Sequence, residues 1–231
     1  MQNDYMEIIN NMNLFIGIVI NFLPLLIAII AHEVSHGWVA YWRGDDTAKR
    51  QGRLSLNPLR HIDPMGSVVV PAILLLSKVG FVIGWAKPVP VNYCNLKKPR
   101  KDIFLISAAG IVTNLYLALI SALLTYLLPF IHSLTVQALA NAFLINMVII
   151  NIIIAAFNLL PIPPLDGSKI FFGWINRPWA AKYVSAEREG LIAIVVLAFI
   201  LPYLANLLGF NFHPLGWYLV NVTKLTASVL L

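Results

Sequence analysis

The fold of this chain is decided by residues 13–42, which read NLFIGIVINFLPLLIAIIAHEVSHGWVAYW. The stretch is almost wholly apolar and exceeds the roughly 20 residues that a helix needs to cross a bilayer. Near its end it carries His32, Glu33 and His36. Ionisable side chains inside a membrane span are rare and normally mark a functional site, although a chance match of buried polar residues is the alternative.

The spacing of these three residues indicates a metal centre. One helical turn separates His32 from His36, so both imidazoles lie on the same face of a helix, and Glu33 stands beside them. Two histidines in this register are typical zinc ligands, and the glutamate between them can act on a water that the metal holds. The sequence therefore predicts hydrolytic zinc chemistry within a membrane helix.

The composition is that of a polytopic membrane protein. Hydrophobic residues make up 59% of the 231 residues and charged residues 11%, with a mean hydropathy of +0.80, whereas soluble domains are about 25% charged. We expect residues 1–231 to form a single membrane-embedded domain with its core at 13–170, because no stretch remains for a soluble domain of ordinary size. Asp4 and Glu7 argue against a cleavable signal peptide. A single cysteine, Cys94, excludes an internal disulfide and a cysteine-rich metal site.

The positive charges indicate topology rather than nucleic-acid binding. The net charge is +6, but the Lys and Arg residues are not gathered on an amphipathic or aromatic-interleaved segment of the kind that binds nucleic acid. Fourteen of the 16 lie in three loops, at residues 43–60, 87–101 and 169–188. The positive-inside rule places these loops in the cytosol and the connections near His132 and Asn211, with the N-terminus, on the opposite side.

The predicted fold class is an all-α polytopic membrane protein. Five transmembrane helices are expected, at residues 13–42, 103–130, 136–160, 191–208 and 215–231. The apolar run 65–85 has basic loops on both flanks and is interrupted by polar and helix-breaking residues, so it is predicted to be a re-entrant hairpin instead of a span. Short β elements are predicted on the cytosolic side at 53–56 and 87–92, where polar and apolar residues alternate or prolines suit an edge strand.

A catalytic zinc needs a third protein ligand, and Asp166 is the candidate. It follows the proline-rich segment 159–165 (LLPIPPL), where the chain must leave the helix and line a cavity at the cytosolic edge of the membrane. His36 lies roughly 10 Å before the cytosolic Arg43, so both motifs reach a similar depth. The alternative for Asp166 is to cap the helix that follows.

Asn158, in the last turns of the preceding span, is a polar group near the same unwound segment. It could donate a hydrogen bond to a developing oxyanion or to a substrate backbone. The alternative is an amide that links helices or satisfies the carbonyls that the prolines leave free.

These motifs resemble those of the site-2 proteases, which are intramembrane zinc metalloproteases. The resemblance is carried by HEVSH (32–36), GRLSLNPLRHIDPMGS (52–67), GWAKPVPVN (84–92) and NLLPIPPLDG (158–167). It implies that His32, His36 and Asp166 hold one Zn²⁺ per chain, that Glu33 is the general base and acid, and that Asn158 assists in the substrate cleft. The chain is similar to small members without a PDZ or CBS domain.

One element departs from the family pattern. The family's Gly-Pro-x-x-Asn element reads Gly110-Ile111-Val112-Thr113-Asn114 in this chain. The missing proline affects the expected helix shape, while Gly110 and Asn114 remain candidates for packing against the metal ligands and supporting them.

The resemblance therefore implies a protease that cleaves transmembrane segments of single-span membrane proteins within the lipid bilayer, in regulated intramembrane proteolysis. The expected location is a bacterial-type plasma membrane with the active site toward the cytosol; no nucleic-acid partner is expected, and no oligomeric state is indicated. A metal transporter would require further polar residues along the other spans. An inactive relative that only binds membrane segments would lack the base or a ligand, and Glu33 argues against it.

Overall fold

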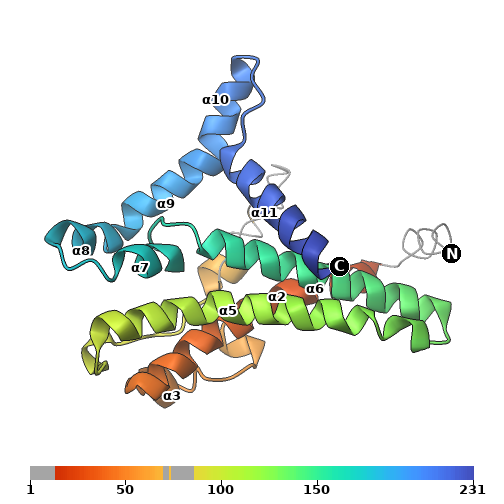
Figure 1. The fold of residues 1–231 in the computed structure, drawn as a ribbon, viewed down its shortest axis with the longest axis horizontal. Coiled ribbons are helices and arrows are strands. Elements are labelled where there is room, and N and C mark those ends of the chain that lie inside the picture. The colour runs from red at the N-terminus through yellow and green to blue at the C-terminus, as the bar shows by residue number, and fades with distance from the viewer. Residues whose placement is uncertain (1–13, 70–72, 74–85) are drawn as a thin grey trace.

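The computed structural model describes residues 14–69, 73 and 86–231, and every regular element in this part of the chain is a helix (Figure 1). Four helices among the described residues are long and apolar enough to cross a membrane: Ile16–Arg43, Pro99–Phe130, Leu134–Asn158 and Glu187–Leu207. The predicted all-α architecture is therefore confirmed for the described residues, and four of its helices have the length and composition of membrane spans. These helices form because long apolar runs can satisfy their backbone groups only internally when lipid surrounds them.

Three long helices form the core bundle. They are α2 (Leu14–Arg43), α5 (Pro99–Thr125) and α6 (Leu134–Asn158), which pack against one another. Small residues such as Ala118 and Ala122 of α5 are fully buried against α6, which lets the two backbones approach closely. This bundle positions the candidate site, because its helices carry most of the residues that the sequence singles out.

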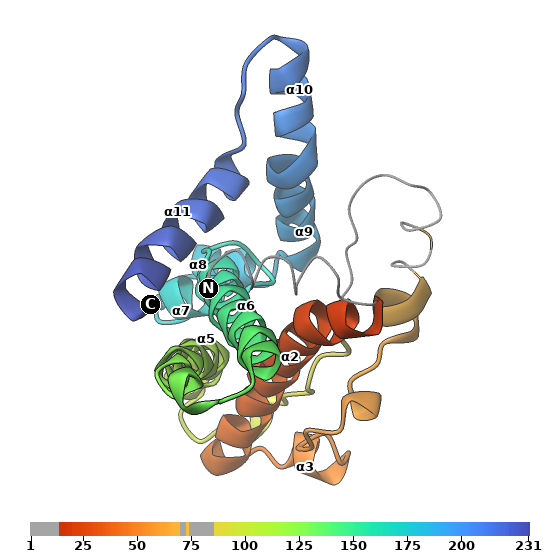
Figure 2. The same ribbon diagram turned by 90° about the vertical axis from the view of Figure 1, so that its right-hand side faces the viewer.

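The other helices are shorter. Their bounds are α3 (Thr47–Arg50), η1 (Pro58–Arg60), η2 (Pro64–Val69), η3 (Tyr93–Asn95), η4 (Leu128–Phe130), α7 (Asp166–Phe172), α8 (Pro178–Val184), α9 (Glu187–Val195), η5 (Val196–Ile200), α10 (Leu201–Leu207) and α11 (Pro214–Leu230). The arm formed by α9, η5 and α10 projects away from the core bundle, and α11 returns to pack on α6 (Figures 1 and 2).

The number of spans stays a prediction. The fifth expected span, residues 215–231, forms the 17-residue helix α11, which is not among the four candidate spans. The predicted re-entrant hairpin at 65–85 lies for the most part outside the described residues. Only its start, in the π-helical turn η2, and residue 73 are described.

The prediction of β elements is wrong for the described residues, since 53–56 and 87–92 are irregular backbone without a strand. Two of the positions in 87–92 are prolines, which have no N–H to donate to a ladder. Two further donors are engaged by side chains: the N–H of Val89 donates to the carboxylate of Glu33, and the N–H of Asn92 donates to another carboxylate. The N–H of Lys87 donates to the carbonyl of His61 at 2.9 Å. These bonds use three of the groups that strand pairing would need.

The segment 87–92 is held by two buried charged residues, Asp45 directly after α2 and Arg53 after α3. The Arg53 guanidinium donates to the carbonyl of Lys87 at 2.6 Å. Asp45 accepts hydrogen bonds from the N–H of Asn92 at 2.7 Å and from the side-chain amide of Asn95 at 2.8 Å. Because both charged side chains are buried and hydrogen-bonded, this connection holds the irregular segment in one place beside α2.

Candidate metal centre

The structure brings His32, His36 and Asp166 together. The histidines project from one face of α2, and their rings meet edge to face with centroids 4.6 Å apart. Their Nε2 atoms lie 3.1 and 3.3 Å from Oδ2 of Asp166, the first residue of α7. The three side chains are at most 12% exposed, and their ligand atoms all lie within 4.8 Å of one another, so this group could hold a metal ion.

Asp166 reaches the histidines because the chain turns sharply after α6. A Cβ atom at Gly167 would lie 2.3 Å from the carbonyl oxygens of Leu159 and Leu160, so only glycine permits this close return. The expected alternative role of Asp166 as a helix cap is not seen, since Leu165 occupies the cap position and no side chain caps α7. The proline-rich segment therefore redirects the backbone and delivers the carboxylate to α2.

The hydrogen bonds behind the rings leave lone pairs at the centre. Nδ1 of His36 lies 2.6 Å from the carbonyl oxygen of Ile106, which can only accept, so Nδ1 carries the hydrogen and Nε2 presents a lone pair. His32 makes the corresponding contact through Nδ1, 2.7 Å from Oδ1 of Asn114. With neutral imidazoles of this kind, Oδ2 of Asp166 is a buried oxygen with no hydrogen-bond partner. Three converging electron-pair donors of nitrogen and oxygen fit a zinc ion.

Protonation of the neighbouring imidazoles favours the ionised form of Asp166. Burial by itself would raise the pKa of its carboxyl group, but positive charge on the neighbouring imidazoles, when they are protonated, lowers the pKa well below its usual range. An ionised carboxylate is the form that binds a metal ion.

The ring of His32 rests directly on the backbone of α5. A Cβ atom at Gly110 would lie 2.4 to 2.7 Å from three atoms of that ring. Gly110 is therefore the position at which α5 makes room for a candidate ligand. The helix runs without a break through Ile111, where the family pattern has a proline.

Glu33 lies beside the centre and Asn158 does not contact it. Oε2 of Glu33 accepts the N–H of Val89 at 3.0 Å, which places the segment 87–92 next to this carboxylate. Asn158 ends α6, and its side-chain amide donates to the carbonyl of Ile154 in its own helix at 3.1 Å. The catalytic roles expected of both residues stay predictions.

Two functional contacts were missed from the sequence. One is the backbone N–H of Val89, which no residue-type pattern can reveal. The other is Asn151 of α6, which hydrogen-bonds Asn114; an asparagine within an apolar span was the available signal.

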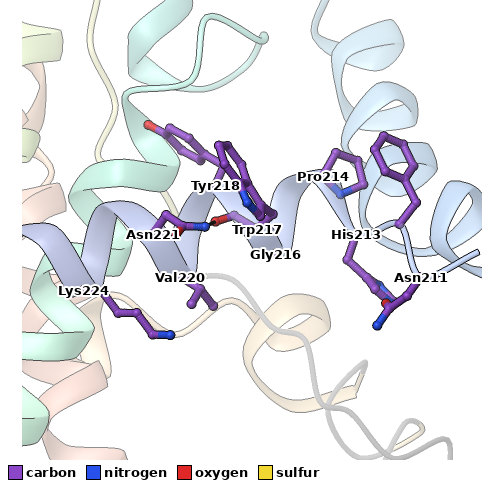
Figure 3. Close-up of a pocket in the computed structure, with 10 residues that line it drawn as sticks. Asn211, His213, Pro214, Gly216, Trp217, Tyr218, Val220, Asn221 and Lys224 are labelled. Carbon is purple, nitrogen blue, oxygen red and sulfur yellow. Dashed lines mark hydrogen bonds between the residues drawn. The ribbon is translucent and has the colours of Figure 1, made fainter.

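The pocket drawn in Figure 3 is separate from this centre. It is lined by residues of α11 and of the loop before it, including His213, Trp217 and Lys224, and by none of the candidate ligands. Tyr218 in its wall donates a hydrogen bond to the carbonyl of Ala156, which ties α11 to α6. This hydrogen bond helps to hold α11 against α6, and the residues that line the pocket contribute no group to the metal centre.

Comparison with known proteins places the chain in a family. The model of peptidase family M50 matches residues 20–203. The protein named "Putative zinc metalloprotease YwhC" of Bacillus subtilis is 41% identical over 186 residues, which cover 78% of this chain and 80% of that protein. No solved structure matches the chain.

More distant similarity is found to two proteins named "Putative zinc metalloprotease Rip2". That of Mycolicibacterium smegmatis is 29% identical over 74% of this chain and 63% of its own length. That of Mycobacterium tuberculosis H37Rv is 28% identical over 83% of this chain and 70% of its own length. Because the family model spans both the HEVSH motif and Asp166, the chain belongs to peptidase family M50, the site-2 protease family of membrane metalloproteases.

Proposed function

We propose that this protein is an intramembrane zinc metalloprotease that hydrolyses peptide bonds within the transmembrane segments of single-span membrane proteins. The observation that carries the proposal is the convergence of His32, His36 and Asp166 at the end of a helix long and apolar enough to span a membrane. Membership of a metallopeptidase family supports the same reading. A soluble peptidase would have no reason to build its metal centre among such helices.

In this proposal His32 and His36 would hold one Zn²⁺ through Nε2, and Asp166 would hold it through its carboxylate. When bound, zinc would supply a Lewis acid that acidifies a water and polarises the scissile carbonyl. Asp166 and the two imidazoles would supply three protein ligands, one negatively charged and two neutral, which is the number that catalytic zinc sites use.

Glu33 moves the proton in the proposed reaction. Its carboxylate accepts a proton from the attacking water and returns it to the nitrogen of the leaving amine, so that it ends the cycle unprotonated. The N–H of Val89 engages Oε2 and leaves Oε1 available for this transfer. We assign Asn158 to the substrate cleft, where its amide can donate to a carbonyl oxygen once it leaves Ile154.

We further propose that the centre faces the cytosol in a bacterial-type plasma membrane. The basic residues that follow α2, beginning with Arg43, support this orientation, because positive loops remain on the cytosolic side. A substrate helix hides its carbonyls in its own hydrogen bonds, so it must unwind before hydrolysis. Cleavage there would release a cytosolic fragment, which suits regulated intramembrane proteolysis.

The test is cleavage of candidate single-span proteins by the purified full chain in detergent. We expect a chelator to stop cleavage and added zinc to restore it. Glu33→Gln should bind about one zinc per chain but not cleave, because the amide cannot carry the proton, and Asp166→Ala should lose zinc. Glu189→Gln, the same change at an exposed residue of α9, should behave as wild type. Substantial cleavage by Glu33→Gln would remove the general-base role, and full zinc occupancy in Asp166→Ala would remove the third ligand.

A further inference from the structure

A chain of amide hydrogen bonds crosses the core bundle and ends on His32. Oδ1 of Asn114, on α5, lies 2.7 Å from Nδ1 of His32 on α2. The Nδ2 atom of Asn114 donates at 2.9 Å to Oδ1 of Asn151 on α6. Both asparagine side chains are fully buried. Buried amides in an apolar bundle are unfavourable unless they are fully paired, so the three helices must be in register for this chain to exist.

Two backbone carbonyls set the direction in which these amide hydrogen bonds run. Nδ2 of Asn114 also lies 3.2 Å from the carbonyl oxygen of Ala28, and Nδ2 of Asn151 lies 2.8 Å from the carbonyl oxygen of Met147. A carbonyl oxygen can only accept, so each amide must point its nitrogen at its carbonyl. Turning either amide around would place two acceptors against each other. Oδ1 of Asn114 is therefore the atom that faces His32, and it must accept the Nδ1 hydrogen.

This arrangement selects one tautomer of His32. With the hydrogen on Nδ1, the Nε2 lone pair faces Oδ2 of Asp166, 3.1 Å away. We infer that Asn151, acting through Asn114, orients His32 and holds it in the tautomer that binds the metal. The inference rests on the proposed function of the centre. Asn151 touches no candidate ligand, so it is a positioning residue.

The two histidines differ in how they are supported. The acceptor for Nδ1 of His36 is the backbone carbonyl of Ile106, which is present whatever side chain occupies position 106. His32 depends on the side chain of Asn114, and the orientation of Asn114 depends in turn on Asn151. Substitution at either asparagine should therefore weaken the hold on one ligand and leave the other unaffected.

Zinc affinity of the full chain in detergent tests the inference. Metal-free protein is titrated with zinc against a chromophoric chelator. Asn114→Leu should weaken binding about 10- to 100-fold, the usual effect of losing the partner of a ligating histidine. Asn151→Leu should weaken it about 2- to 10-fold, because one neutral hydrogen bond further from the metal is lost.

Asn146→Leu is the matched control. Asn146 lies on the same helix as Asn151 and donates to the carbonyl of Ile20 and to Oδ1 of Asn21, both on α2. Like Asn151, it links α6 to another core helix by an amide hydrogen bond, but its partners lie on α2 and do not contact His32. Asn146→Leu should lower the melting temperature while its zinc affinity stays at the wild-type value. Asn151→Ala replaces Asn151→Leu if the larger side chain prevents folding.

A second measurement does not depend on metal. In metal-free protein with ¹⁵N-labelled histidine at pH 8, the NMR shifts of His32 should report hydrogen on Nδ1 in the wild type. In the Asn151 variant they should report a mixture of tautomers, whereas those of His36 should not change.

The possible outcomes distinguish failure of the positioning role of Asn151 from failure of the proposed metal centre. Wild-type zinc affinity together with an unchanged His32 tautomer in the Asn151 variant would overturn the positioning role while leaving the metal centre intact. A wild-type protein that binds no zinc, or a His32→Ala variant that keeps full affinity, would instead overturn the proposed function itself.

Discussion

The backbone N–H of Val89 donates a 3.0 Å hydrogen bond to Oε2 of Glu33, although 56 positions separate the two residues in the sequence. Glu33 is one residue from His32, so this bond ties the segment 87–92 to the edge of the metal centre. Arg53 donates a hydrogen bond to the carbonyl of Lys87, two residues before Val89. The expected general base is thus oriented by a loop whose position depends on a buried arginine.

Removing the N–H of Val89 should impair catalysis even when position 89 keeps an apolar side chain of similar size. Val89→Pro deletes the donor, so we expect the kcat for a model substrate to fall by about 10- to 100-fold, as for loss of a hydrogen bond to a charged group. Val89→Ala keeps the N–H and loses only packing, including contact near Gly37, so its kcat should fall far less. Equal rates for the two variants would show that the bond does not orient Glu33.

Gly110→Ala should weaken zinc binding. An alanine normally stabilises a helix relative to glycine by about 0.8–1 kcal/mol, but this Cβ would lie within 2.7 Å of the His32 ring. The ring must shift, and we expect zinc affinity measured by chelator competition to fall about tenfold or more. Gly17→Ala on α2 is the control, because nothing lies within 4 Å of its Cβ. Wild-type affinity in Gly110→Ala would mean that the ring does not need this close approach.

Asp45 should contribute stability that depends on pH. Burial would raise the pKa of its carboxyl group, but hydrogen bonds from Thr47, Asn92 and Asn95 lower it below its ordinary value. Because the folded pKa is below the unfolded pKa of about 3.9, the contribution is complete above that pH and is lost as the pH falls through the folded pKa. Asp45→Asn should therefore destabilise the metal-free protein by about 1–3 kcal/mol at pH 7.

The measurement is the melting temperature of wild type and Asp45→Asn from pH 7 to pH 3. The gap between the two should narrow below pH 4. Asp46→Asn is the control, since Asp46 is exposed and pairs only with the exposed Arg50, and it should change the melting temperature little. A gap that stays constant down to pH 3 would show that ionised Asp45 is not what holds the loop.

Both ends of the apolar run 65–85 should be cytosolic, because basic residues on both flanks oppose translocation. Single cysteines at Arg60 and Lys97, in a background without Cys94, can be labelled from either side of the membrane. Neither should react with an impermeant reagent added outside intact cells. Labelling of Lys97→Cys from outside would identify a true span and would reverse the orientation of the helices that follow.

Substrate choice should follow the ease of unwinding. Residues such as Gly, Asn or Pro within the cytosolic half of a target helix lower the free energy of unwinding by roughly 0.5 to 3 kcal/mol each relative to Leu. Replacing them with Leu should slow cleavage markedly, whereas the same replacement in the outer half should not. Equal rates for the two sets would show that unwinding near a cytosolic cleft does not select substrates.

The sequence determined the parts of this protein that depend on local geometry. An i, i+4 spacing places His32 and His36 on one face of any helix, and the apolar composition makes the long segments helical in lipid. Three prolines before Asp166 prevent α6 from continuing, and the helix ends at Asn158. The helical architecture follows from these local rules, and the similar membrane depth of the two motifs predicted that Asp166 approaches the histidines; the structure shows both.

Only the tertiary structure decided which distant groups satisfy one another. The segment 87–92 is not a strand, and two of its N–H groups instead donate to the carboxylates of Glu33, on α2, and Asp45, in the turn after α2. Asn151 faces Asn114, and so supports His32, only because α6 packs against α5 in one register. A buried polar group is favourable only when its partner is in place. That partner is chosen by the packing of whole helices, which no local pattern of residues encodes.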